Sequence, residues 1–220
     1  MIDATALSEK PVLTGPRVRL APLSIRHAAA FHTACQDPET RRLTGSHHDF
    51  TLEELQRWCT GSADRADRLD LAIEDRETGD FLGELALNEI DPPNAHGSFR
   101  IALVPDATDR GIGSEAIRLL LDYAFDRVGL HRVQLEVYDY NPRARRAYEK
   151  CGFEVEGRLR EALFWDGTWH DVLVMAALRS RRGGGEDTGT NTDVGVDLDS
   201  GGGWPAQRPP RRDGLIGPGR

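Results

Sequence analysis

The feature that most constrains the fold is a β-strand that leads through a glycine-rich turn into a long amphipathic helix. Residues 98–104 are predicted to be the strand, and Gly111 and Gly113 open a helix predicted to run to Val128. The unpaired N–H groups and the positive dipole end of such a helix start suit an anion such as a diphosphate. Taken alone, the pattern is equally typical of an ordinary tight turn.

The rest of the chain mixes strands with short helices, which predicts an α+β fold with one central sheet. Further strands are predicted over residues 17–21, 70–74, 80–90, 132–138, 153–163 and 170–178. Further helices are predicted over residues 23–35, 51–63 and 141–150. Two of these helices begin with capping signals, Thr51 followed by Glu54, and Asn141 followed by Pro142.

Composition excludes several classes of protein. The net charge of −8, from 28 basic and 36 acidic residues, disfavours binding to a nucleic-acid backbone. No run approaches the roughly 20 apolar residues of a membrane-spanning helix, and the first residues lack the pattern of a secretory signal. Three separated cysteines form neither a disulfide framework nor a metal-ligand spacing. We therefore expect a cytoplasmic protein without a nucleic-acid or membrane partner.

The composition changes near residue 180, which predicts one domain over residues 1–180 and a tail over 181–220. The tail holds 11 Gly and 4 Pro in 40 positions, and Trp204 is its one aromatic residue. Such a segment buries too little apolar surface to offset the entropy of ordering, so we expect it to be disordered. The alternative is that residues 209–212 (PPRR) form a docking motif.

A second motif begins 28 residues after Gly113 and reads N-P-R-A-R-R-A-Y-E-K-C-G-F over residues 141–153. Together with D-R-G-I-G-S-E-A over residues 109–116, it resembles the GNAT superfamily of N-acetyltransferases. The continuation over residues 156–175 resembles the RimJ/RimL-type branch of that superfamily. The resemblance covers residues 12–178, and the joint occurrence of the two motifs is specific where each alone is not.

This resemblance implies a mixed, curved sheet that is splayed between its fourth and fifth strands and flanked by helices. It also implies that acetyl-CoA is the cosubstrate, with its pantetheine arm in the opening and its pyrophosphate on the glycine-rich loop. By the family pattern, the cofactor-binding residues are Leu103, Val104, Thr108, Asp109, Arg110, Gly111, Ile112, Gly113, Ser114, Asn141 and Ala144. Thr108 stands where the family usually has Arg or Gln, so we expect weaker binding rather than none.

Acetyl transfer to an amine requires a base for the amine proton, an oxyanion donor, and an acid for the leaving thiolate. By resemblance Tyr148 lies near the sulfur, and its phenol is suited to be the acid; otherwise it is an apolar anchor of its short helix. Glu84 is our first candidate for the base, ahead of Glu89 and Asp91, although such acids are often merely solvent-facing. The oxyanion donor is expected to be a backbone N–H of Leu103 or Val104.

Other polar residues are less informative. His47 and His48 are expected in a solvated loop, and His170 with Asp166 and Asp171 does not have the arrangement of a metal site, so we predict no metal. Cys151 is expected to be a packed core residue. One of three arginines in the second motif is a candidate for the 3′-phosphate end of CoA (Arg143, Arg145 and Arg146).

The resemblance therefore implies transfer of an acetyl group to a primary amine, either a protein N-terminus or a small molecule such as an aminoglycoside or a polyamine. An acidic rim suits a cationic acceptor; its residues are Asp37, Glu39, Asp49, Glu53, Glu54 and Asp91. The alternative is a module that binds or senses acyl-CoA without turnover. A homodimer is an expectation from the family only.

Overall fold

The computed structural model describes residues 2–181, and the predicted tail lies outside these residues except for Arg181. The helices are α1 (Ala4–Ser8), α2 (Ala28–Gln36), α3 (Pro38–Thr44), α4 (Leu52–Gly61), α5 (Ile112–Tyr123) and α6 (Pro142–Glu149). The strands are β1 (Leu13–Thr14), β2 (Val18–Pro22), β3 (Leu69–Asp75), β4 (Phe81–Asp91), β5 (His96–Leu103), β6 (Arg132–Tyr138), β7 (Glu154–Trp165) and β8 (Thr168–Leu178). Short turns of other helical types join several of them.

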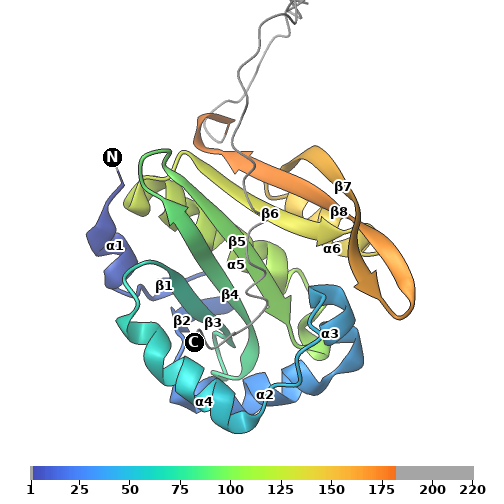
Figure 1. Cartoon of the computed structure of the whole chain (residues 1–220). Helices are drawn as coiled ribbons and strands as arrows, with labels where there is room; N and C mark the ends of the chain where they lie inside the picture. The colour runs from blue at the N-terminus through green and yellow to red at the C-terminus, as the bar shows by residue number, and fades with distance from the viewer. Residues whose placement is uncertain (1, 182–220) are drawn as a thin grey trace, which may run out of the picture.

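One mixed sheet of eight strands runs through this part of the chain in the order β1-β2-β3-β4-β5-β6-β8-β7. All neighbouring strands are antiparallel except β5 and β6, which are parallel. Figure 1 shows that α2 and α4 lie along one side of the sheet, while α5 crosses behind it. The sheet and its flanking helices give the predicted GNAT fold.

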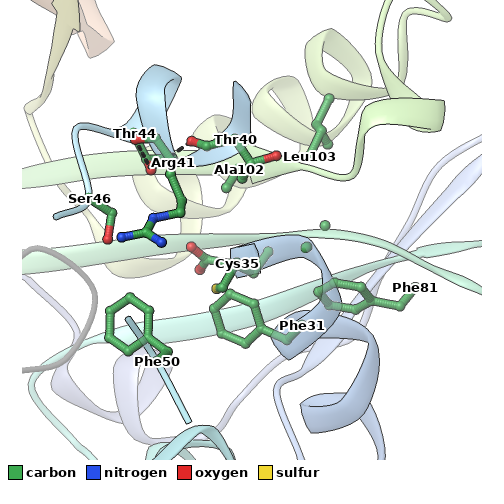
Figure 2. A pocket seen from close by; sticks show the side chains of 13 residues that line it. Phe31, Cys35, Thr40, Arg41, Thr44, Ser46, Phe50, Phe81, Ala102 and Leu103 are labelled. Atoms are coloured by element: carbon green, nitrogen blue, oxygen red, sulfur yellow. Dashed lines mark hydrogen bonds between the residues drawn. The ribbon is translucent and has the colours of Figure 1, made fainter. Parts of the chain in front are cut away.

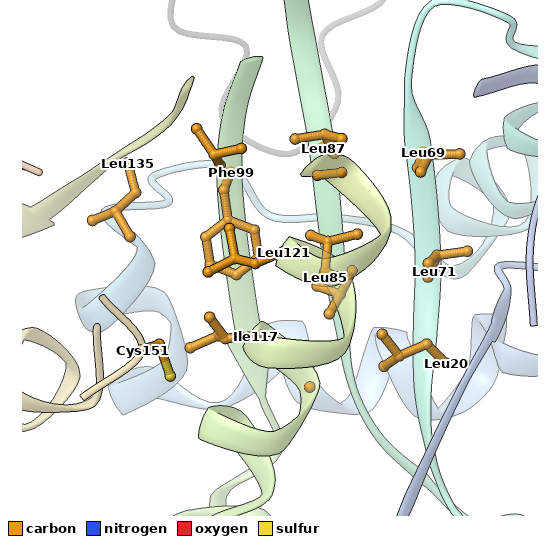
Figure 3. Packing of buried hydrophobic residues seen from close by; sticks show 14 of the residues in the cluster. Leu20, Leu69, Leu71, Leu85, Leu87, Phe99, Ile117, Leu121, Leu135 and Cys151 are labelled. Carbon is orange, nitrogen blue, oxygen red and sulfur yellow. The ribbon is translucent and has the colours of Figure 1, made fainter. Parts of the chain in front are cut away.

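The two faces of the sheet carry two apolar clusters. Alternate residues of β3 and β4, including Leu71 and Leu85, pack on Ile117 and Leu121 of α5 (Figure 3). On the opposite face, Ala72 packs with Phe31 of α2 and with α4. This second face also carries buried carboxylates, and it is the face on which a polar acceptor site can form.

The predicted strands are present with bounds that differ by at most two residues. Of the predicted helices, α2 begins five residues later than expected, because residues 25–27 form a 3-10 turn. The main difference is α3, because no helix was predicted between residues 36 and 50. Asp37 caps this helix by accepting a hydrogen bond from the Thr40 N–H at 2.7 Å, and Pro38 occupies its first turn. A second difference is the end of α5, where residues 124–128 continue as a π-helical turn up to Gly129.

No helix within residues 2–181 combines the length and the apolar character needed to cross a membrane.

Candidate active site

The site is a cleft that opens where β5 and β6 separate. Their parallel ladder has three pairs, and the last joins Ser98 to Gln134. Beyond this pair the strands diverge, and a cleft of about 1070 Å³ lies between and around them. Its walls come from β4, β5, β6, α3, α6 and the loop before α5.

Strand alternation decides which backbone groups face the split. The Val104 N–H donates to the Leu82 carbonyl at 3.0 Å, and the Val104 carbonyl accepts from the Ala107 N–H at 3.0 Å. Residues of β5 alternate between the two neighbouring strands, so the backbone groups of Ile101 and Leu103 point toward the split. Our expectation for Val104 is therefore wrong, because both of its backbone groups are already engaged. Ile101, which the sequence reasoning missed, takes its place beside Leu103.

The glycine-rich loop leads directly into the first turn of α5. Gly111 is the N-cap residue with a φ of 76°, a left-handed conformation that glycine adopts without strain, and no side chain caps the helix. The N–H groups of Ile112, Gly113 and Ser114 are consequently available to an anion. A Cβ on Gly113 would lie 3.2 Å from Leu103 Cδ1, a tight contact from which the Leu103 side chain would have to move by a few tenths of an ångström. The loop therefore fits a pyrophosphate group.

The predicted loop residues divide into two groups. Thr108, Asp109, Gly111, Gly113 and Ser114 line the cleft. The Arg110 side chain instead donates to the Asp106 carbonyl at 3.4 Å, and Ile112 is buried in the core with 2% exposure. Their side chains do not line the cleft, and only their backbones can serve the loop.

Arg17 holds the loop in place and was not singled out from the sequence. Its Nη1 donates to the Arg110 carbonyl at 2.6 Å, and its Nε donates to Glu115 Oε2 at 2.9 Å. Glu115 Oε1 also accepts the Arg17 N–H at 2.8 Å. A residue 94 positions upstream of Gly111 thereby fixes the turn that supplies the anion-binding N–H groups.

Helix α6 forms the wall opposite the loop. Asn141 caps it by accepting the Ala144 N–H at 3.0 Å, which leaves the side-chain amide N–H groups of Asn141 free to serve the cleft that it lines. Ala144 also lines the cleft. Arg143 reaches across to Asp109 at 3.2 Å and ties α6 to the loop.

Tyr148 reaches the cleft from α6 and is 8% exposed. Its ring packs edge-on against Phe99 and Phe153. Burial raises the pKa of Tyr148 to about 12, so the phenol keeps its proton throughout the physiological range. Tyr148 is thus an apolar anchor of α6 that also borders the cleft, and its role as the acid stays a prediction.

Glu84 reaches the cleft from β4 on the face that carries α2. Its side chain is 3% exposed, and Arg100 Nη2 lies 3.9 Å from its Oε2. Burial raises the pKa of Glu84 above its usual value, while the charge of Arg100 partly opposes this rise. Of the other two candidates, Glu89 lines the cleft but is exposed and accepts from Ser98 Oγ at 2.8 Å. Asp91 caps the following turn through Asn94 and does not line the cleft.

A small side cavity of about 10 Å³ adjoins Glu84, which is room for about one water molecule. Its apolar wall includes Phe31, Cys35 and Phe50, and its polar wall includes Arg41 and Ser46 (Figure 2). The carboxylate of Glu84 therefore borders two spaces, the main cleft and this side cavity.

Helix α3 spans the open end of the split. The Tyr138 hydroxyl donates to the Thr44 carbonyl at 3.4 Å, and the Tyr140 hydroxyl donates to the Arg42 carbonyl. The Arg42 guanidinium lies 4.7 Å above the Tyr140 ring. Tyr138 is the last residue of β6 and Tyr140 comes two residues later. These contacts therefore hold α3 against the half of the sheet formed by β6, β8 and β7.

The predicted acidic rim is only partly present. Asp37 and Glu39 on α3 line the cleft, and so do His47 and His48. The other four rim residues do not line the cleft; they are Asp49, Glu53, Glu54 and Asp91. Of these, Asp49 pairs with Arg41 at 2.7 Å.

Within residues 2–181 no three His, Cys, Asp or Glu side chains are grouped so as to hold a metal ion. His170 Nδ1 lies 3.6 Å from Asp139, and its ring packs edge-on against Tyr140. Cys151 is buried, and its thiol contacts the Ser114 carbonyl at 3.5 Å.

Comparison with known proteins decides the family. The acetyltransferase (GNAT) domain model matches residues 17–154, which is more than half of the chain. The chain belongs to the GNAT acetyltransferase family. It is an acyltransferase that uses acetyl-CoA.

Among curated relatives, the spermidine N(1)-acetyltransferase of Vibrio cholerae is 35% identical over 118 residues, covering 54% of this chain and 67% of the relative. The Escherichia coli spermidine N(1)-acetyltransferase is 31% identical over 97 residues, covering 44% and 52%. A putative ribosomal N-acetyltransferase of Bacillus subtilis is 32% identical over 101 residues, covering 46% and 55%. The relatives thus have names that point to different acceptors.

Among solved structures, the Vibrio cholerae spermidine N-acetyltransferase in complex with CoA and spermine has a TM-score of 0.70 and is 26% identical, covering 76% of this chain and 98% of that one. A GCN5-related N-acetyltransferase from Brucella melitensis has a TM-score of 0.67 and is 28% identical, covering 79% and 81%. The fold is shared over most of each chain.

The contacts of Arg17 lead to a prediction for cofactor binding. Arg17→Ala should weaken acetyl-CoA binding by about tenfold, because the Gly111 turn loses the side chain that fixes its N–H groups. Isothermal titration calorimetry at fixed salt measures the dissociation constant, and Arg118→Ala on the exposed face of α5 is the matched control. An unchanged dissociation constant for Arg17→Ala would show that the turn holds its shape alone.

Proposed function

We propose that this protein transfers an acetyl group from acetyl-CoA to a primary amine by direct attack in a ternary complex, with Glu84 as the base and Tyr148 as the acid. The observation that carries the proposal is that one cleft is bordered by a buried carboxylate from β4 and a buried phenol from α6. The split strands and the glycine-rich loop between them fit the donor. The acceptor is then a protein N-terminus or a small-molecule amine, including a polyamine or an aminoglycoside.

Binding of the donor rests on the chain's own backbone. The groups of Ile101 and Leu103 that face the split would pair with the pantetheine arm as an added strand does. The N–H groups of the first turn of α5 would hold the pyrophosphate. Thr108 contributes no charge there, so the uncapped helix start and its glycines would carry most of that binding.

The proton steps follow from the two environments. Glu84 removes a proton from the acceptor amine, directly or through a water in the side cavity, and its raised pKa makes it a better base. A backbone N–H of Ile101 or Leu103 stabilises the oxyanion as the amine attacks. Tyr148 then protonates the leaving thiolate. A buried environment destabilises the thiolate anion, which favours this proton transfer.

Four further expectations from the sequence are part of this proposal. We propose membership in the RimJ/RimL-type branch, a cytoplasmic location, assembly as a homodimer, and no nucleic-acid or membrane partner. Support for the first comes from the motif over residues 156–175, which forms most of β7 and most of β8.

The first test is calorimetric titration with acetyl-CoA, followed by a panel of amines at saturating acetyl-CoA. We expect stoichiometric binding in the micromolar range and release of CoA with at least one amine. Binding without turnover of any amine would favour the alternative, a module that senses acyl-CoA. Absence of binding up to about millimolar acetyl-CoA would reject the proposed function altogether.

Tyr148→Phe tests the acid. The turnover number should fall at least about tenfold, because the thiolate would leave without a proton donor, while acetyl-CoA binding stays within about twofold. Steady-state kinetics and calorimetry on the same preparation measure both quantities. Tyr123→Phe on α5 is the matched control, since its hydroxyl donates to the Ala6 carbonyl away from the cleft. An unchanged turnover number would reject the acid role.

Glu84→Gln tests the base and has a distinct signature in pH. The wild-type rate should fall as the pH drops through the raised pKa of Glu84, above the usual 4.5, because the protonated acid cannot accept a proton. The Gln variant should lose that acid limb and about a hundredfold in turnover number. Asp91→Asn is the matched control.

The same variant, Glu84→Gln, should lose turnover without losing thermal stability. A carboxyl group with a raised pKa in the folded state favours its neutral form, so the ionised form costs stability at every pH above that pKa. Glu84→Gln should therefore melt at the same or a higher temperature at pH 7. A variant that melted lower and kept the full rate would contradict a catalytic role.

A further inference from the structure

Three buried carboxylates lie on the same face of the sheet; they are Asp70, Glu74 and Glu84. Arg68 donates to Asp70 at 2.7 Å, and Arg19 donates to Glu74 at 2.8 Å. Arg100 stands 3.9 Å from Glu84, which is beyond hydrogen-bonding distance. Glu84 is the one of the three that lines the cleft, and it is also the one without a hydrogen bond from an arginine.

The guanidinium of Arg100 has hydrogen-bond donors that no residue within 2–181 accepts. Its Nε atom is buried and has no partner within residues 2–181, and its guanidinium makes no hydrogen bond to any of these residues. The side chain lines the cleft from β5 and is 26% exposed. Its neighbour Ile101 directs its backbone toward the split. A guanidinium without an acceptor is unfavourable in such a partly buried position, and its Nη groups could donate to an oxygen atom of a ligand in the cleft.

A cation at this position is unfavourable for a simple alkylamine acceptor. The guanidinium repels the ammonium form of the acceptor and lowers the pKa of Glu84, which makes the base weaker. Both effects are offset if the acceptor brings an oxygen atom that Arg100 can bind. The planar fork of guanidinium donors is suited to a carbonyl or carboxylate group.

The spacing of Glu84 and Arg100 fits an amine and an oxygen on neighbouring atoms. In an α-amino carbonyl compound the nitrogen and the carbonyl carbon are attached to the same carbon atom. Glu84 can therefore face the amine while Arg100 faces the carbonyl oxygen. The α-amine of a peptide N-terminus also has a pKa of about 8, against about 10.4 for an alkylamine, so more of it is neutral and reactive.

We propose that Arg100 is a specificity-determining residue, which selects acceptors that carry a carbonyl or carboxylate oxygen next to the reacting amine. Free amino acids and peptide N-termini share this chemistry, and linear polyamines lack it. The proposal rests on the proposed function, because it assigns the acceptor of the same site.

Three matched acceptors test it: leucinamide, leucine and 3-methylbutylamine, which has the same side chain without the carbonyl. The values of kcat/KM are compared per concentration of neutral amine, which removes the difference in pKa. The variants are Arg100→Gln and Arg100→Lys, and Arg57→Gln on the exposed side of α4 is the control. Circular dichroism and calorimetry with acetyl-CoA verify that each variant folds and binds the donor.

We expect wild type to prefer leucinamide or leucine over 3-methylbutylamine by at least about tenfold. Arg100→Gln should bring this ratio to within about twofold, Arg100→Lys should lie between, and Arg57→Gln should keep the ratio. Preference for leucine indicates a free amino acid, and preference for leucinamide indicates a peptide N-terminus. An equal loss with all three acceptors, or a wild type that prefers 3-methylbutylamine, would overturn the proposal.

A binding measurement separates this inference from the proposed reaction. With CoA bound, calorimetry compares leucinamide and 3-methylbutylamine as ligands of wild type and of Arg100→Gln. Tighter binding of leucinamide that disappears in Arg100→Gln supports the role of Arg100 even if no acceptor is turned over. Equal affinities in both proteins refute it, whether or not the reaction occurs.

Discussion

The early end of the β5–β6 ladder is the constraint on which the rest of the site depends. A parallel pair that stopped at Ser98 and Gln134 in an ordinary sheet would leave backbone groups of both strands without partners. Here those groups border a cleft large enough for a ligand. The exposed edge of β5 can therefore serve as a binding surface, and a donor that pairs with Ile101 and Leu103 would complete the sheet.

A sheet split in this way needs other links between its halves. Helix α3 supplies one, because its last carbonyls accept from Tyr138 and Tyr140 at the end of β6. The Arg143–Asp109 pair supplies another between α6 and the loop. His47, stacked on Trp165 at 4.7 Å, adds a third contact at the β7–β8 hairpin. These links fix the width of the cleft while the ladder itself is open.

Much of the fold could be predicted from local patterns, because Thr51 with Glu54, Asn141 with Pro142, and the alternation in β6 are short-range signals. Helix α3 was missed although Asp37 and Pro38 are a capping signal, since its seven residues bury no apolar side chain. The contacts of Arg17 could not be predicted from the sequence for another reason. Its partners lie about a hundred residues away, and only the fold brings them together. Val104 was misassigned because the sequence does not show which neighbour a strand residue faces.

The chemistry of the site depends on a burial that no sequence pattern reveals. In the sequence, Glu84 is one acidic residue of many, and its distinction is that β5 and α2 enclose it without giving it a hydrogen-bonded cation. An enclosed carboxylate of this kind destabilises the fold, whereas Asp70 and Glu74 on the same face are neutralised by close arginines. A protein tolerates such a residue where a ligand supplies the missing partner. In the proposed acceptor site, one acceptor molecule would bind both Glu84 and Arg100. This accounts for the absence of a direct hydrogen bond between the two side chains.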